Sequence, residues 1–151
     1  KEFNARNSSK KVKLDTKYSN KVTIIKIHPG QDPSILEYLQ KKGYKGVILE
    51  TTGLGQVPGR NSKFNWLPKI KNTVSSGMVI CATSQTIFGG LNQNVYSSGR
   101  LLKETGIIAL RDMLSETALL KLGWVLAHKN WNVKEKMLEN ISGEFNDKIG
   151  K

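Results

Sequence analysis

The stretch that decides the fold is residues 78–124, MVICATSQTIFGGLNQNVYSSGRLLKETGIIALRDMLSETALLKLGW. It opens with an apolar run, residues 78–82, which has the composition of a buried strand. A polar loop, a short helix near residues 98–104, a second apolar run at 107–110 and a long amphipathic helix from Ser115 follow. Strand, helix, strand and helix in this order predict half of an α/β domain built on a parallel sheet.

Two more apolar runs, residues 22–27 and 46–50, precede this stretch and predict two further strands. Between them, Asp32 is expected to cap a helix that has Pro33 at its first position and Gly43 after its end. A helix over residues 66–76 carries Pro68 in its first turn.

A last helix is expected at residues 133–141, with Asn132 as its cap and Glu135 at capping-box spacing. The sequence therefore predicts an α/β fold: a four-stranded parallel sheet with helices on both faces, doubly wound in the Rossmann or flavodoxin manner. We assign residues 21–151 to this domain and residues 1–20 to a polar linker or tail. Within the tail, Val12, Leu14 and Tyr18 alternate with polar residues, which is the pattern of a short edge strand.

The chain is strongly basic, with 24 Lys and Arg against 12 Asp and Glu and a net charge of +12. Such an excess of positive charge is compatible with an anionic partner such as RNA. The lysines, however, are scattered along the predicted helices, so a solvated surface explains them without a nucleic-acid site. We expect no cofactor, no metal and no membrane segment, because metal-ligand spacings and long apolar runs are absent from the sequence. No secretory leader is visible, and Cys81 lies inside an apolar run as a buried, unreactive thiol would, so we expect a cytoplasmic protein.

Small polar residues follow two of the predicted strands directly. Ligands of open parallel sheets meet the carboxyl ends of strands, so these positions predict the lip of a pocket. Ordinary turns and helix caps use the same residue types, and from composition alone that interpretation is favoured. The candidate residues are Thr52, Gly53, Gln56, Ser84, Gln85 and Asn92.

The sequence offers no set of residues for chemistry on its own. It contains no G-x-S-x-G elbow and no P-loop, and its two histidines, His28 and His128, stand apart. The carboxylates that follow strands, such as Glu50 and Asp112, suit caps and loops. We therefore expect a chain that lines a site and contributes no catalytic residue.

Several motifs together resemble one family, the carboxyl-terminal domain of asparaginase/glutaminase-type amidohydrolases. The resemblance covers residues from about 20 to about 145 and is most specific at residues 112–122, DMLSETALLKL. The other segments are GVILE with TGLG at 46–55, ATSQ at 82–85, and NVYSSGR at 94–100. The last of these and the TGLG turn are most similar to the D subunit of the archaeal glutamyl-tRNA(Gln) amidotransferase.

The resemblance implies that the nucleophilic threonine belongs to a separate amino-terminal half, in strings such as T-G-G-T and H-G-T-D-T that this chain lacks. The chain would close the active site of that half and be inactive alone. Its partner would be that amino-terminal domain or chain, in a homo- or hetero-oligomer, and tRNA would be met only through the larger complex. In bacterial members the turn at 52–56 can carry an asparagine that touches substrate, whereas this chain has Leu54.

Three functions remain open from the sequence. The first is a half of a glutaminase that supplies ammonia within a Glu-tRNA(Gln) amidotransferase. The second is the carboxyl-terminal subunit of a split L-asparaginase. The third is a non-enzymatic α/β module that binds small molecules or associates with RNA.

Overall fold

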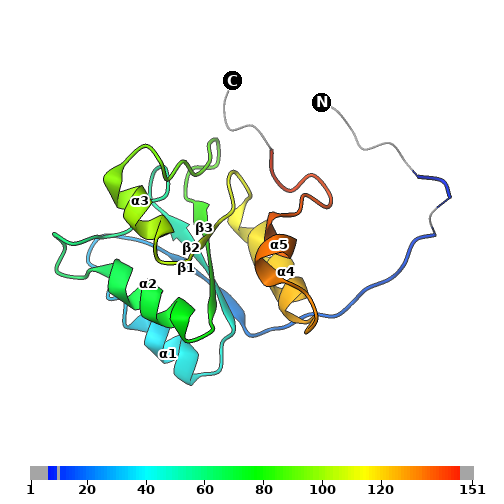
Figure 1. The fold of residues 1–151 in the computed structure, drawn as a ribbon, viewed down its shortest axis with the longest axis horizontal. Helices are drawn as coiled ribbons and strands as arrows, with labels where there is room; N and C mark the ends of the chain where they lie inside the picture. Colours follow the sequence, from blue (N-terminus) through cyan, green and yellow to red (C-terminus); the bar gives the residue numbers. More distant parts are fainter. Residues whose placement is uncertain (1–6, 10, 147–151) are drawn as a thin grey trace.

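A four-stranded parallel sheet forms the centre of the protein (Figure 1). The computed structural model describes residues 7–9 and 11–146. The strands lie in the order β1-β2-β3-β4, and each pairs in parallel with its neighbour. Both the parallel sheet and the α/β class predicted from the sequence are confirmed. The strands are β1 Val22–Lys26, β2 Gly46–Thr51, β3 Val79–Ser84 and β4 Ile108–Ala109.

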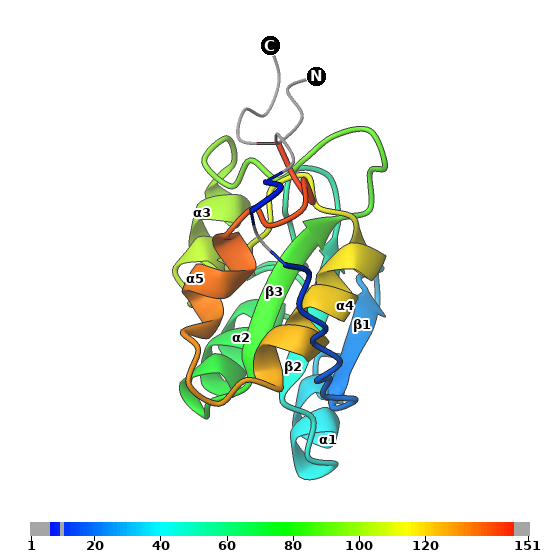
Figure 2. The same cartoon turned by 90° about the vertical axis from the view of Figure 1, so that its right-hand side faces the viewer.

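Helices cover both faces of the sheet, as predicted (Figure 2). Successive right-handed crossovers between neighbouring strands place the first three helices on one face. Both faces are covered because the chain turns back after β4, not because the strand order reverses. The first face carries α1 Ile35–Lys41, α2 Trp66–Ser75 and α3 Ser97–Lys103, and the second carries α4 Ser115–Leu126 and α5 Val133–Leu138.

Alternation along β2 divides the core into two layers. Val47 and Leu49 pack under α1 and α2, whereas Ile48 packs under α4, and all three side chains are fully buried. Successive strand residues point to opposite faces, so a run that is apolar throughout is expected of a strand covered on both sides. Gly46, at the start of β2, lies directly under Leu122 and Leu126 of α4.

Two predicted helix boundaries are corrected by the structure. The helix α1 begins at Ile35 rather than at Pro33, because Asp32 binds the backbone N–H of Ser34 (2.8 Å) in a turn that precedes it. The helix α5 ends at Leu138 rather than near 141, because Glu139 adopts extended backbone angles. Its start is as predicted: the Asn132 side chain accepts the N–H of Glu135 (3.3 Å).

The edge strand expected in the amino-terminal tail is wrong for residues 11–18, which form no strand. Val12 and Leu14 are exposed, and the segment docks on α4 instead of on the sheet. The N–H of Ser19 donates to the carbonyl of Gly123 (2.9 Å), and the ring of Tyr18 lies against that glycine. Residues 1–6 and 10 of the tail lie outside the described residues.

No helix in the described part of the chain is both long and apolar enough to cross a bilayer.

Candidate functional site

The candidate residues lie together at the carboxyl edge of the sheet, the edge where the strands end. The turn after β2 is closed by hydrogen bonds from the N–H of Thr52 (3.0 Å) and its hydroxyl (3.2 Å) to the carbonyl of Gln56. Gly53 and Gly55 adopt positive φ angles, +50° and +107°, which side chains other than glycine tolerate poorly. The backbone conformation of the TGLG turn therefore explains its two glycines without any ligand.

The loop after β3 is tied to this turn. The hydroxyl of Ser84 donates to the carbonyl of Gly53 (2.9 Å) and also contacts the hydroxyl of Thr86 (2.5 Å). The N–H of Asn92 donates to the carbonyl of Leu54 (3.0 Å), so a third segment joins the same turn. These three segments therefore lie together at the carboxyl edge, and their role as the lip of a substrate pocket stays a prediction.

The side chain of Gln85 has a structural role that could not be predicted from the sequence. Its side-chain amide nitrogen donates to the carbonyls of Ile27 (2.6 Å), just after β1, and of Glu50 (2.9 Å), near the end of β2. Both amide hydrogens are thus engaged by backbone, and the carbonyl oxygen of Gln85 is the atom left for another partner. The residue holds the strand ends of the lip in place.

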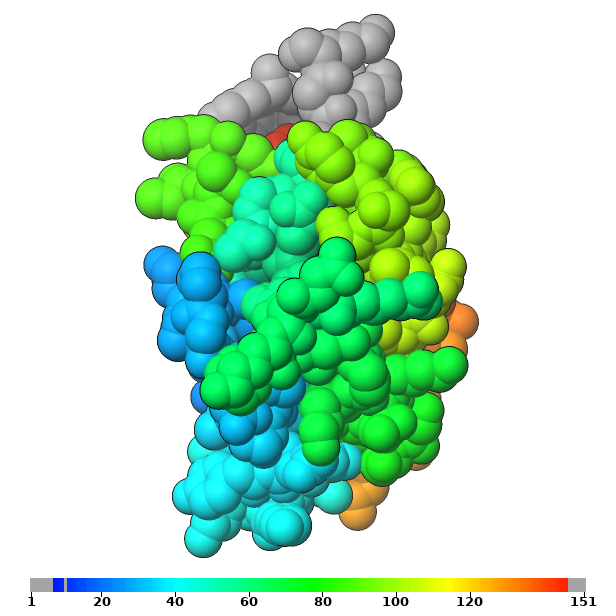
Figure 3. All heavy atoms as spheres, turned by 90° about the vertical axis from the view of Figure 1, so that its left-hand side faces the viewer, coloured from blue at the N-terminus to red at the C-terminus, as the bar shows by residue number. Residues whose placement is uncertain are grey.

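A hollow of about 350 Å³ lies beside the turn, on the face that carries α1 to α3. Figure 3 views this face, with the turquoise turn after β2 between the blue segment after β1 and the yellow-green α3. Of the six candidates, Thr52 and Gln56 line the hollow, and Gly53, Ser84, Gln85 and Asn92 do not. Its other lining residues include three that sequence reasoning missed: His28, Ser62 and Ser98. For His28 a signal existed, since it directly follows the first strand; Ser62 and Ser98 had none.

Three buried hydroxyl groups near the carboxyl edge hold neighbouring elements together. Thr51 donates to the carbonyl of Thr83 (2.6 Å), and the Thr83 and Ser115 hydroxyls share a hydrogen bond (2.8 Å). All three residues are buried, and no base adjoins them among the residues that the structure describes. These hydrogen bonds join β2, β3 and the first turn of α4, and none of the three hydroxyls is activated as a nucleophile.

Within the described residues, the titratable groups do not assemble into a catalytic set either. His28, at the carboxyl edge, contacts the carbonyl of its neighbour Pro29 through Nδ1 (3.0 Å). His128 pairs with Asp15 (2.9 Å) beyond the far end of α4. Burial raises the pKa of the Cys81 thiol far above its usual value, which makes it unreactive as expected. Residues 7–9 and 11–146 contain no group of three or more side chains that could hold a metal ion.

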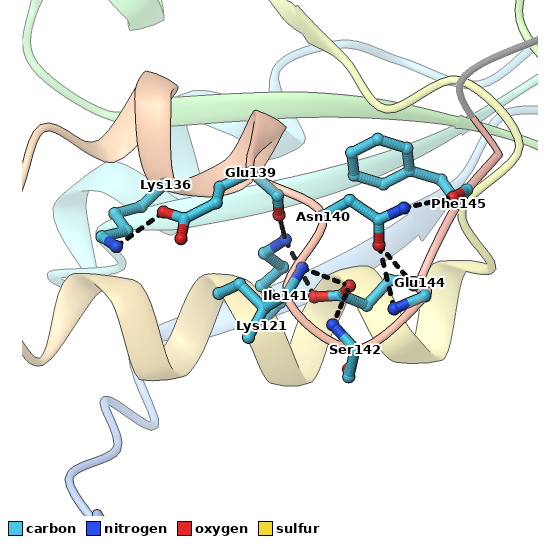
Figure 4. Close-up of polar contacts among 9 residues, drawn as sticks. Lys121, Lys136, Glu139, Asn140, Ile141, Ser142, Glu144 and Phe145 are labelled. Carbon is cyan, nitrogen blue, oxygen red and sulfur yellow. Dashed lines mark hydrogen bonds and ion pairs between the residues drawn. The ribbon is translucent and has the colours of Figure 1, made fainter. Parts of the chain in front are cut away.

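The other side of the edge is closed by the loop after α5, residues 139–146 (Figure 4). Lys121 of α4 is buried and pairs with Glu144 (3.0 Å) while also donating to the carbonyl of Glu139. Asn140 accepts the N–H groups of Gly143 and Glu144 and closes the loop. Asp112, in the loop after β4, accepts the N–H (2.8 Å) and the side-chain amide (2.5 Å) of Asn146. Asp112 is a loop residue as predicted, and it holds Asn146 against the loop after β4.

Comparison with known proteins agrees with this architecture. The model of the glutaminase/asparaginase C-terminal domain family matches residues 21–137. The D subunit of the glutamyl-tRNA(Gln) amidotransferase from Thermococcus kodakarensis is 45% identical over 136 residues, covering 89% of this chain and 30% of that protein. The corresponding subunit from Sulfolobus acidocaldarius is 43% identical over 145 residues, covering 95% of this chain and 31% of that protein. The chain thus spans about a third of the length of these relatives.

Solved structures show the same relationship. The thermostable L-asparaginase from Thermococcus kodakarensis superposes with a TM-score of 0.84 at 28% identity, covering 96% of this chain and 44% of that one. L-asparaginase I from Vibrio cholerae superposes with a TM-score of 0.73 at 27% identity, covering 83% and 38%. The resemblance read from the sequence motifs is confirmed.

Proposed function

Because the chain belongs to the glutaminase/asparaginase C-terminal domain family, we propose that it closes the active site of a separate amino-terminal catalytic half of an amidohydrolase. That half would supply the nucleophilic threonine and hydrolyse the side-chain amide of glutamine or asparagine. The observation that carries the proposal is the identity of 41–45% to the amidotransferase D subunits over most of this chain. It favours a role within a Glu-tRNA(Gln) amidotransferase in the cytoplasm, where the ammonia released from glutamine would amidate Glu-tRNA(Gln).

The carboxyl edge suits a closing surface. Its turns present hydroxyls, amides and backbone groups, which can hold the polar ends of an amino acid without adding a catalytic charge. Exposed apolar side chains stand in the same loops, with Phe88 98% exposed and Ile87 74% exposed. Leu54 adds an apolar side chain to the turn itself. Side chains of this kind indicate a surface that another protein surface covers.

A split asparaginase is the second candidate, and the superposition on the Thermococcus kodakarensis L-asparaginase favours it. The two candidates share the fold and the closing role and differ in the amide that they prefer. They also differ in the fate of the ammonia, which an asparaginase releases and an amidotransferase passes on.

Reconstitution tests the proposal. The purified chain is mixed with an amino-terminal half that carries the T-G-G-T and H-G-T-D-T strings, and ammonia release from glutamine and from asparagine is measured. We expect no release by the chain alone, because it supplies no activated nucleophile, and release after mixing. A preference for glutamine supports the amidotransferase, and a preference for asparagine supports the asparaginase.

Robust amide hydrolysis by the purified chain alone would refute the closing role. A mixture that forms a complex and still hydrolyses neither amide would refute the proposed enzyme.

A further inference from the structure

Six exposed lysines gather at the amino edge of the sheet, the edge opposite the candidate site. In Figure 2 the strands point upwards, so this edge lies at the bottom of the view. The lysines come from the starts of β1 and β2, the end of α1, the tail and the segment after α4. We call them the amino-edge lysines: Lys17, Lys21, Lys41, Lys42, Lys45 and Lys129.

The fold brings these separate segments together. The N–H of Lys45 donates to the carbonyl of Lys21 (2.7 Å), which joins the starts of β1 and β2. Gly46 lies under Leu126, so the end of α4 meets the start of β2. Lys17 and Lys129 line a shared surface hollow of about 420 Å³ with His128 and Trp131.

The positive charge at this edge is not neutralised within the described residues. None of the amino-edge lysines forms an ion pair there, whereas Lys69, Lys121 and Lys136 each pair with a glutamate. The nearby carboxylate of Asp15 is engaged by His128. Residues 16–22, 38–46 and 124–134, which lie at this edge, contain no aspartate or glutamate, and Glu135 in the first turn of α5 accepts a hydrogen bond from the Asn132 side chain.

Aromatic rings lie among the lysines. The ammonium of Lys42 stands 5.6 Å from the centre of the Tyr38 ring, and that of Lys21 stands 5.8 Å from the Tyr44 ring. Two tyrosines, Tyr18 and Tyr38, are exposed near this edge. Lysines interleaved with aromatic rings are typical of surfaces that bind nucleic acid.

We propose that the amino-edge lysines form a binding surface for the phosphate backbone of RNA. The inference goes beyond the closing role, because it assigns a direct RNA contact to this chain rather than to a larger complex. The two edges then have separate tasks: the carboxyl edge faces the catalytic half, and the amino edge faces the polyanion. Contacts of this kind position an RNA and read no sequence.

The test measures the affinity of the chain for a fluorescently labelled tRNA as salt concentration is raised. The test variant is Lys21→Gln/Lys45→Gln/Lys129→Gln. The matched control, Lys26→Gln/Lys63→Gln/Lys71→Gln, removes the same charge from lysines elsewhere. The slope of log affinity against log salt should fall by about 0.7–0.9 for each phosphate-contacting lysine removed, so by about 2–3 in the test variant. The control should keep nearly the wild-type slope.

Equal losses in both triple variants would overturn the proposal, because they would show attraction by net charge alone. Absence of salt-dependent tRNA binding would overturn it as well. Displacement of tRNA by polyglutamate as readily as by unlabelled tRNA would assign the surface to an acidic protein instead. The test variant should still support amide hydrolysis in the reconstituted enzyme, so failure of one proposal is distinguishable from failure of the other.

Discussion

Gln85 shows how one side chain can hold a candidate site together. Its amide nitrogen reaches the carbonyls of Ile27 and Glu50, 58 and 35 residues away in the sequence. The Ile27 carbonyl lies just past the end of β1, and the Glu50 carbonyl, which also accepts the N–H of Ile27 (3.0 Å), lies at the last paired position of β1 with β2. A side chain that serves backbone in this way fixes the positions of the neighbouring turns on which a pocket lip depends.

Replacing Gln85 by alanine removes both hydrogen bonds; the Ile27 carbonyl loses this donor, whereas the Glu50 carbonyl keeps the N–H of Ile27. We expect the free energy of unfolding to fall by about 1–3 kcal/mol, as for a lost buried partner. In the reconstituted enzyme, Gln85→Ala should lower turnover without separating the halves. Urea unfolding and ammonia release measure the two effects.

Asn130, an exposed amide residue at the opposite edge of the sheet, provides the control, since Asn130→Ala should change neither quantity appreciably. Wild-type kinetics in Gln85→Ala would leave the fold intact and move the pocket away from this residue.

At the scale of elements, α4 is the helix on which the second face of the sheet depends. Leu122 is fully buried and lies against Gly46, where a β-carbon would stand 2.7 Å from one of its methyl groups. Leu119 and Leu126 are partly buried and pack on the same core layer. The close approach of α4 to β2 therefore needs a glycine on one side and a leucine on the other.

Truncating Leu122 to alanine should leave a cavity between α4 and the sheet. We expect the free energy of unfolding to fall by about 2–5 kcal/mol. Leu120, on the outer side of the same helix and 63% exposed, offers the matched control. Leu120→Ala should change stability by less than about 0.5 kcal/mol. A loss under about 1 kcal/mol in Leu122→Ala would show that another face of α4 meets the sheet.

The loop after α5 makes a pH-dependent contribution through Glu144. Burial alone would raise the pKa of this carboxyl, but the N–H groups of Ser142 and of Glu144 itself, with the Lys121 ammonium, lower it below its usual value of 4.5. A carboxyl with a lowered pKa stabilises the folded chain above its usual pKa, and the contribution is lost as pH falls through the folded value.

We therefore expect Glu144→Gln to unfold with a smaller pH dependence than the wild type between about pH 6 and about pH 3. Urea unfolding at both ends of this range measures the difference. Lys121→Met alone should be more destabilising than Lys121→Met/Glu144→Gln, because the single change leaves a buried carboxylate without its cation. Parallel pH profiles for the wild type and Glu144→Gln would contradict the coupling.

At the scale of the whole molecule, residues 15–19 of the tail attach to α4 and the segment after it. Tyr18 covers Gly123 of α4, and the carboxylate of Asp15 lies against His128 and Trp124. A β-carbon at position 123 would overlap the Tyr18 ring. The contact sets where the chain enters β1 and where Lys17 joins the amino edge.

Gly123→Ala should displace Tyr18 while leaving α4 intact, because alanine favours a helix by about 1 kcal/mol over glycine. We expect faster trypsin cleavage after Lys17, with cleavage after the exposed Lys13 unchanged. Leu120→Ala should leave both rates alone. Undiminished protection of Lys17 in Gly123→Ala would mean that Tyr18 does not hold the tail.

The elements could largely be read from the chain because their signals are local. β-Branched runs predicted the strands, and Asn132 with Glu135 predicted the start of α5. The predicted start of α1 was wrong because Asp32 forms a turn in place of a helix cap, and the predicted end of α5 was wrong because the helix stops at Glu139 without a glycine to mark its end. The family was also readable, since its motifs are contiguous strings.

By itself, then, the sequence determined the parallel α/β sheet, its helices, the family and the edge where the polar loops meet. Tertiary structure alone decided what each polar side chain does there: Gln85 serves distant carbonyls, Lys121 is buried in an ion pair, and His28 joins the lip. It also placed lysines that are far apart in the sequence at one edge of the sheet. The ends of α1, of α4 and of the tail lie beside one another only in the folded chain. The physical reason is range: propensities, caps and hydrophobic periods act over a few residues, whereas hydrogen-bond partners and surface charge depend on contacts between distant segments.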